Sequence, residues 1–173
     1  PYHLCEFMSA VTTPAEEFQQ KIGDRGWVAV CDPTCGAGAL LVAFANECRK
    51  KEINYQTDVL FVAQDIDYIV GLMCYLQLSL MGCAGYVVIG DTLLHPSTAL
   101  DRRGLIPRPD QNIWYTPFYF RDIWHYRRIW AQMDLLLQTD EKPAEQVTGK
   151  LKSSAALPPL PLQETKTGQL TLF

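Results

Sequence analysis

The sequence predicts an α/β fold built on a parallel β-sheet. Three short apolar runs, residues 27–31, 59–63 and 86–89, have the length and composition of buried strands. Two longer segments of helical composition, residues 39–51 and 67–81, separate them. A strand, helix, strand, helix, strand order requires right-handed crossovers, which make the sheet parallel. We expect the strand order 3-2-1, with a ligand at the carboxyl ends of the strands.

Two helices are expected before the first strand. Residues 2–11 place Leu4, Phe7, Met8 and Val11 on one face of a helix. A capping box with proline at the first helical position, Thr13-Pro14-Ala15-Glu16, then begins a second helix. That helix should end near residue 22, because Gly23 follows.

The chain changes character after residue 91. Residues 95–112 contain prolines, arginines and turn formers, so a loop is expected. Residues 113–137 interleave aromatic side chains with arginines, and helical spacing begins at Arg121. Such a pattern serves single-stranded or flipped bases. The favoured alternative is a helix that packs its tryptophans on the sheet and points its arginines outward. We also expect an open edge at the first strand, covered by this segment or by another chain.

Composition restricts the classes of function. The 173 residues carry 15 basic and 19 acidic side chains, which argues against a protein that coats DNA by charge alone. Six cysteines form no Cys-x-x-Cys pair, so neither zinc nor a disulfide framework is expected. The longest apolar stretch, residues 68–81, is too short to span a bilayer. With no signal-peptide pattern, we expect a cytoplasmic protein with reduced thiols and no membrane partner.

A glycine-containing loop follows the first predicted strand. The segment reads Asp32-Pro33-Thr34-Cys35-Gly36-Ala37-Gly38-Ala39-Leu40-Leu41. Glycines allow positive φ and a close approach of the backbone to a ligand, and the next helix offers unpaired N–H groups to an anion. Asp32 is placed to accept a hydrogen bond from a ligand amine or hydroxyl. An ordinary strand-to-helix turn is the alternative.

This string closely resembles motif I of the N6-adenine DNA methyltransferases, above all the modification subunits of type I restriction-modification systems. Three further matches follow the family's order: the segment from Pro1 to Met8, then Gln64-Asp65-Ile66-Asp67, and Gly90-Asp91-Thr92-Leu93. The resemblance covers residues 1 to about 95. It implies a Rossmann-like methyltransferase fold, incomplete here because only three to four strands are evident, and S-adenosylmethionine as cofactor. The implied cofactor residues are Tyr2, Asp32, Thr34, Cys35, Gly36, Gly38, Asp65, Ile66, Asp91 and Thr92.

Each of these residues also has a simpler explanation. Asp67 is expected to cap the next helix, and Asp91 could begin a turn. Asp65 alone would more often be a surface acid, and Cys35 a small packing residue.

The family's catalytic motif, Asn-Pro-Pro-aromatic, does not occur in the chain. The nearest candidate is Thr116-Pro117-Phe118, in which a hydroxyl would replace the amide oxygen that accepts from the target amino group. Tyr115-Thr116-Pro117-Phe118 and Trp124-His125-Tyr126-Arg127-Arg128 also resemble, more loosely, methylase-like proteins of bacterial mobile elements.

The resemblance leaves several functions open. It implies a DNA adenine methyltransferase of a restriction-modification system or mobile element, with DNA as partner and with a second subunit or a homodimer possible. One alternative is a catalytically inactive, cofactor-binding adaptor, and another is a methyltransferase that acts on RNA or protein. We expect residues 1–137 to form one domain, with 1–95 as the cofactor half and 96–137 as a divergent segment. Residues 138–173 are expected to form a flexible tail.

The last five residues carry a separate signal. Gln169-Leu170-Thr171-Leu172-Phe173 resembles the peptide with which bacterial proteins dock on the replication sliding clamp. In that peptide the glutamine hydrogen-bonds at the edge of an apolar pocket, into which leucine and phenylalanine insert. The clamp-docking residues would be Gln169, Leu170, Leu172 and Phe173. A terminal strand or an apolar anchor on the domain is the alternative.

Overall fold

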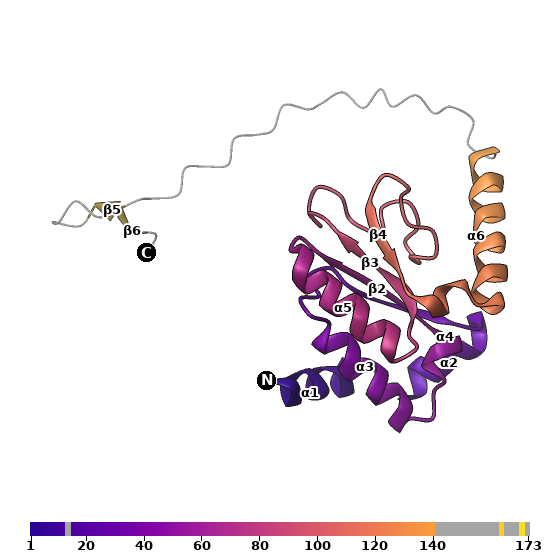
Figure 1. Ribbon diagram of the computed structural model, residues 1–173, viewed down its shortest axis with the longest axis horizontal. Helices are drawn as coiled ribbons and strands as arrows, with labels where there is room; N and C mark the ends of the chain where they lie inside the picture. The colour runs from indigo at the N-terminus through magenta and orange to yellow at the C-terminus, as the bar shows by residue number, and fades with distance from the viewer. Residues whose placement is uncertain (13–14, 141–162, 165–169, 172–173) are drawn as a thin grey trace. The chain divides into compact units, whose positions relative to one another are not determined.

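A four-stranded sheet forms the centre of the first of two units, Pro1–Glu141 and Lys142–Phe173 (Figure 1). The computed structural model describes residues 1–12, 15–140, 163–164 and 170–171. The strands lie in the order β1-β2-β3-β4. Their bounds are β1 Val28–Asp32, β2 Val59–Asp65, β3 Ala84–Ile89 and β4 Asn112–Tyr115. The first three are parallel, which confirms the predicted 3-2-1 order, and β4 runs antiparallel to β3.

Strand β3 begins two residues earlier than predicted, at Ala84 rather than Tyr86. Gly85 lies within the strand and pairs with Phe61 of β2. An ideal Cβ at Gly85 would lie 1.9 Å from the carbonyl oxygen of Phe61, so the close packing of the two backbones requires a glycine here.

Helices α3 Ala39–Lys50 and α5 Tyr68–Leu80 pack on one face of the sheet. Helix α1 Tyr2–Thr12 packs on α3, and α4 Tyr55–Asp58 is a single turn before β2. Helix α2 Ala15–Arg25 contacts the start of β1 and continues through Gly23, so the predicted stop at that glycine is wrong. An exposed glycine only weakens a helix. The left-handed conformation that ends α2 is at Gly26, with φ 75°.

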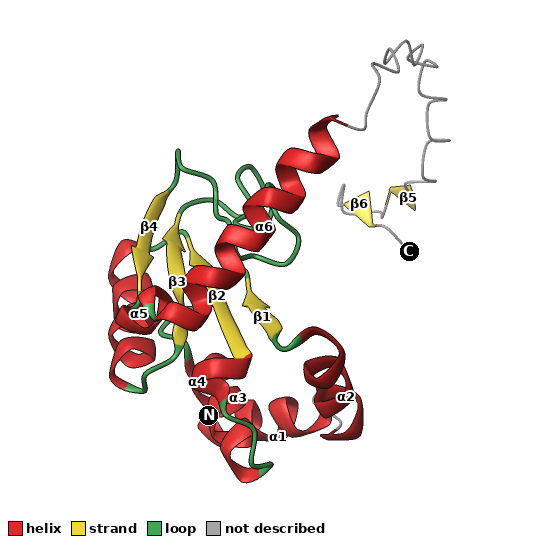
Figure 2. Cartoon of the chain, turned by 90° about the vertical axis from the view of Figure 1, so that its right-hand side faces the viewer, coloured by secondary structure: helices red, strands yellow, loops and turns green. Residues whose placement is uncertain are grey.

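The opposite face carries the 3₁₀ turn η1 Pro117–Phe120 and the long helix α6 Asp122–Asp140, which crosses in front of the sheet in Figure 2. Trp124 is fully buried against the sheet, as predicted, and it packs edge-to-face on Trp27. Trp130, however, is 66% exposed. Arg127 turns inward and donates to the carbonyl oxygens of Gly26 and Thr57, so the prediction of outward arginines is wrong for this residue.

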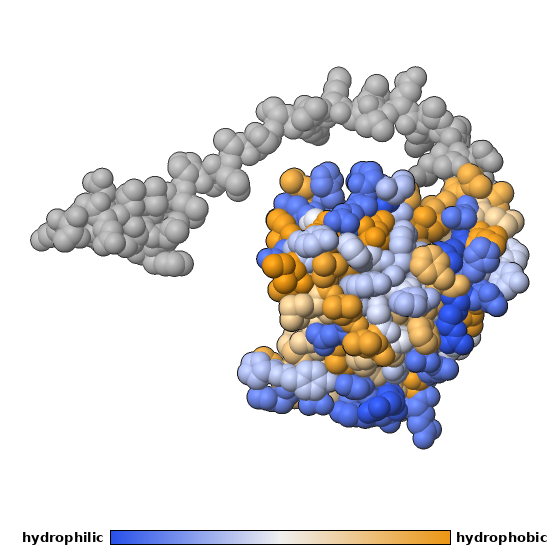
Figure 3. Space-filling view, viewed as in Figure 1, coloured by the Kyte–Doolittle hydropathy of each residue, from blue (hydrophilic) through white to orange (hydrophobic). Residues whose placement is uncertain are grey.

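Apolar side chains remain exposed on α1 and α5, as well as on α6. Figure 3 shows hydrophobic residues gathered over α5. On α1 the predicted apolar face points to solvent, and on α5 a similar stripe does so. The exposed residues are Leu4, Phe7, Met8 and Val11 on α1, and Ile69, Met73, Leu76 and Leu80 on α5.

In the second unit, β5 Gln163–Glu164 pairs antiparallel with β6 Leu170–Thr171. Among the residues described in either unit, no helix combines the length and the apolar character needed to cross a membrane.

Candidate functional site

Three aspartates meet at the carboxyl edge of the sheet. Asp32 ends β1, Asp65 ends β2, and Asp91 follows β3. The glycine loop after β1 is tied to the next strand, because the Gly36 N–H donates to Asp65 Oδ2 at 2.8 Å and the Cys35 N–H donates to the Gln64 carbonyl at 2.9 Å. The structure therefore brings together three of the four predicted motifs, those at residues 32–41, 64–67 and 90–93.

A further hydrogen bond joins this loop to the segment after β3. The Thr92 hydroxyl donates to the Pro33 carbonyl at 2.6 Å. The loops after β1, β2 and β3 are thus connected by bonds that cross from one strand end to the next. We call this cluster, made of residues 32–38, 64–67 and 90–92, the carboxyl-edge site.

The two glycines of the loop have different surroundings. Both have positive φ, 52° at Gly36 and 86° at Gly38. An ideal Cβ on Gly38 would lie 2.7 Å from Cys74 Sγ, so this glycine allows the loop to pack on α5. A Cβ on Gly36 would meet no atom within 4 Å, so Gly36 faces open space. Gly38 provides no side-chain cap for α3, and the first N–H groups of a helix without such a cap are suited to an anion.

The carboxyl-edge site carries uncompensated negative charge. The pKa of Asp32 is raised by burial and also by the nearby charge of Asp65, while a hydrogen bond from the Thr34 N–H opposes the shift. None of the ion pairs found among the described residues includes Asp32, Asp65 or Asp91. Opposite charges attract most strongly where water is partly excluded, so the site favours a ligand with a cationic group.

Simpler explanations are confirmed for two of the aspartates. Asp67 caps α5, because its Oδ1 accepts from the N–H groups of Ile69 and Val70. Asp91 begins a turn, with Oδ1 accepting from the N–H groups of Leu93 and Leu94. The turn does not prevent Asp91 from binding a ligand, since Oδ2 has no hydrogen bond to any described residue.

Cys35 is a buried packing residue within the loop. A hydrogen bond with the Cys74 thiol, together with burial, raises the pKa of Cys35. A thiol of raised pKa is a poor nucleophile, so nothing supports covalent chemistry at this position.

Gln64 is a functional residue that sequence analysis missed. Its side chain is fully buried, donates to the carbonyls of Gly90 and His95, and accepts from the Ser97 N–H at 2.8 Å. It thereby ties the segment that carries Asp91 to β2. In the sequence its only signal was its place in Gln64-Asp65-Ile66-Asp67, directly after the predicted strand 59–63.

Tyr2 is not brought to the carboxyl-edge site. Its hydroxyl accepts a hydrogen bond from Asn46 Nδ2 at 2.7 Å, about two turns along α3 from the glycine loop.

Thr116, the candidate for contact with a target base, lies at the opposite end of the sheet. Its N–H donates to the Gly85 carbonyl and its hydroxyl donates to the Cys83 carbonyl, both at the start of β3. Strand β4 is antiparallel, and this direction carries residues 116–118 away from the carboxyl ends. The four residue steps from Gly85 to Ile89 correspond to about 13 Å along the strand. Thr116, Pro117 and Phe118, the candidates for the catalytic motif, therefore do not lie beside the expected cofactor residues.

No protein-family model, no curated protein and no solved structure matches this chain. The chemistry of the carboxyl-edge site must therefore be argued from its own residues. Of the four predicted clamp-docking residues, only Leu170 lies among the described residues, in β6. Gln169, Leu172 and Phe173 lie outside them.

Proposed function

We propose that this chain binds S-adenosylmethionine at the carboxyl-edge site, as the cofactor-binding part of an N6-adenine DNA methyltransferase-like protein. The observation that carries the proposal is the hydrogen bond between Gly36 N–H and Asp65, because it joins the loop expected to hold the amino acid portion to the acid expected to hold the ribose. The resemblance of the sequence motifs to those of the methyltransferases supports the same assignment.

The amino acid end of the cofactor matches one side of the site. Its ammonium and sulfonium are cationic, and the partly buried Asp32 needs a cationic partner. Its carboxylate is an anion suited to the N–H groups at the start of α3. Gly36 leaves room for the backbone to approach the ligand closely.

The nucleoside end matches the other side. Asp65 accepts one N–H on each carboxylate oxygen, from Gly36 and Asp67, which leaves a lone pair on each oxygen for a ribose hydroxyl. Exposed apolar side chains suited to the adenine ring follow the two strand ends: Ile66 is 72% exposed and Leu93 is 93% exposed. The bound cofactor would supply an electrophilic methyl group, and the residues named here would bind and orient it.

A second candidate function is a cofactor-binding adaptor that transfers no methyl group. The position of Thr116 favours it. This residue is fully buried, and its hydroxyl is hydrogen-bonded to the backbone at the amino end of β3, away from the carboxyl-edge site. If the chain is part of an active methyltransferase, the groups that hold the target adenine come from another polypeptide or from outside the described residues.

Isothermal titration calorimetry with S-adenosylmethionine tests the shared premise. Asp65→Ala should abolish binding because it removes the acceptor for the ribose hydroxyls. Gly36→Ala should weaken binding by at least about ten-fold, since the new methyl group occupies ligand space, while φ strain costs about 1–2 kcal/mol of stability. Failure of the parent chain to bind, or unchanged binding by Asp65→Ala, contradicts the proposal.

Gly38→Ala is the matched control for Gly36→Ala. Its Cβ would collide with Cys74 instead of with the ligand, so circular dichroism should show a larger loss of stability than in Gly36→Ala.

Transfer of labelled methyl to unmethylated DNA separates the two functions. Label in DNA, with or without an added partner subunit, supports the enzyme. Binding of S-adenosylmethionine without methyl transfer, both with and without the partner subunit, supports the adaptor.

A further inference from the structure

Strand β1 is a free edge of the sheet. It pairs with β2 on one side, and no described strand pairs with the other. Val28 and Val30 face the core between the sheet and α3, whereas Ala29 and Cys31 on the opposite face are exposed. The five residues include no proline and no lysine, which proteins commonly use to block an edge strand. The backbone groups along this edge are therefore open to another strand.

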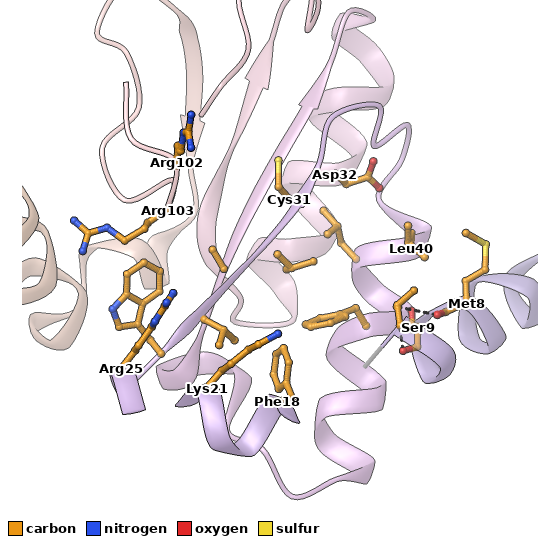
Figure 4. Close-up of a pocket in the computed structure, with 17 residues that line it drawn as sticks. Met8, Ser9, Phe18, Lys21, Arg25, Cys31, Asp32, Leu40, Arg102 and Arg103 are labelled. Carbon is orange, nitrogen blue, oxygen red and sulfur yellow. Dashed lines mark hydrogen bonds between the residues drawn. The ribbon is translucent and has the colours of Figure 1, made fainter. Parts of the chain in front are cut away.

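A groove of about 1040 Å³ follows the whole length of β1 (Figure 4). One wall, formed by α1, α2 and α3, has an apolar part with Phe18, Leu41 and Phe44, and α2 adds Lys21 and Arg25. The other wall carries Arg102 and Arg103. The groove touches the carboxyl-edge site only at Asp32, so it is distinct from the place proposed for the cofactor.

The cationic wall is held in place by a fixed turn. Asp101 is buried and accepts from the N–H groups of Arg103 and Leu105. Gly104 packs on the sheet, and its carbonyl accepts from the hydroxyl of Tyr86 at 2.8 Å. Because the turn is tied to the core at both points, its two arginines stay beside β1.

The groove is basic although the chain is acidic overall. Its lining includes four cations, Lys21, Arg25, Arg102 and Arg103, against a single carboxylate, Asp32. The whole chain has a formal net charge of −4. Arg103 has partners in Asp101 and Asp134, but Lys21, Arg25 and Arg102 form no ion pair with a described residue.

We propose that the free edge of β1 binds an extended, acidic segment of another protein as an additional strand. Side chains of a strand point alternately to the two faces of a sheet, so one set would contact the apolar wall and the other the arginine wall. The preferred segment therefore alternates apolar with acidic residues. Backbone hydrogen bonds to β1 would give affinity, and the two walls would give specificity.

A second copy of this chain fits the groove poorly. Pairing β1 with β1 of another copy would bring two sets of four cations together, and like charges facing each other across an interface weaken association. Charge complementarity thus favours an acidic partner.

Fluorescence anisotropy with labelled synthetic peptides of about six residues, the usual strand length, tests the proposal. The probe alternates valine and glutamate. One control has lysine in place of each glutamate, and another has N-methylated amides that cannot donate to a strand edge. We expect the acidic peptide to bind and both controls to lose at least about ten-fold in affinity. Equal binding of the acidic and N-methylated peptides, or no binding of the acidic one, overturns the proposal.

Cys31 reports where the peptide binds. It is the exposed cysteine on β1, and the other five are partly or fully buried. Bound peptide should slow alkylation of Cys31, measured by mass spectrometry, and leave the rate at Cys5 of α1 unchanged. Binding that leaves the Cys31 rate unchanged places the peptide elsewhere and overturns the proposal. If inorganic phosphate alone slows alkylation of Cys31, the groove is an anion site and the proposal is wrong. If a higher protein concentration slows it, the groove is a self-association surface and the proposal is also wrong.

A pair of charge reversals tests the cationic lining. Arg25→Glu combined with Arg102→Glu should weaken binding of the acidic peptide by at least about ten-fold. Arg49→Glu combined with Arg121→Glu changes the net charge equally at exposed positions outside the groove, and should leave the affinity nearly unchanged. Equal effects of the two pairs would mean that only net charge matters, and the assignment to β1 would be wrong. Both pairs should retain S-adenosylmethionine binding, which separates this proposal from the proposed function.

Discussion

Asp32 has opposite effects on folding and on the proposed binding. Its raised pKa means that the folded chain holds this proton more tightly than the unfolded chain does. The unfolded state therefore releases the proton first as pH rises, and stability falls as pH rises from the ordinary aspartate pKa through the raised one. The same unfavourable negative charge is what a cationic ligand would neutralise.

Asp32→Asn should raise the urea midpoint of unfolding at about pH 7, because the variant has no charge to desolvate. Near pH 3, where Asp32 is protonated in both states, the difference between the variant and the parent should disappear. S-adenosylmethionine affinity should fall by about ten-fold, the effect of losing one charge-assisted hydrogen bond. A lower urea midpoint for the variant at about pH 7 would contradict this account.

Gln64→Met should destabilise the fold by about 1–3 kcal/mol in urea titrations, because the buried Ser97 N–H loses its acceptor. The His95 carbonyl keeps its bond from Gln111, which limits the loss. The exposed Gln77 also bonds to a backbone carbonyl, that of Ala37, so Gln77→Met is a matched control with an expected cost below about 0.5 kcal/mol. Equal costs for the two variants would show that Gln64 has no special role.

At the scale of elements, the direction of β4 decides what the site can contain. The sequence of residues 112–115 does not reveal whether this strand runs parallel or antiparallel to its neighbour, because the residues with which it pairs lie far away in the sequence. The three parallel strands could be predicted, since each is a short apolar run between helices. The partners of Gln64 lie 26 to 33 residues away, so no local pattern could reveal its role.

Thr116→Val tests the assignment of Thr116 to structure. The substitution keeps the shape of the side chain but leaves the Gly85 N–H without its side-chain acceptor. Stability should fall by about 1–3 kcal/mol in chemical denaturation. S-adenosylmethionine binding and any methyl transfer should be unchanged once the chain is folded. Loss of transfer at unchanged stability would restore Thr116 as a candidate for the target base.

At the scale of the whole molecule, the two units carry different predictions. The second unit contains the peptide that resembles a clamp-docking segment, of which only Leu170 and Thr171 are described. Deleting residues 169–173 should abolish a pull-down with the bacterial sliding clamp and leave S-adenosylmethionine binding by the first unit intact. A pull-down that survives the deletion would exclude docking through this peptide.

The inward-facing side chains of α6 have a consequence for the order of folding. Trp124 bonds to the Gln56 carbonyl, and Arg127 bonds to the carbonyls of Gly26 and Thr57, across 68 to 101 residues of sequence. Contacts this distant slow folding, and during synthesis they cannot form until residue 127 has left the ribosome. The amino ends of β1 and β2 must therefore wait for α6 to be made. A nascent chain stopped before α6 should be readily cut by protease near Trp27, a residue that becomes protected only when α6 closes over it.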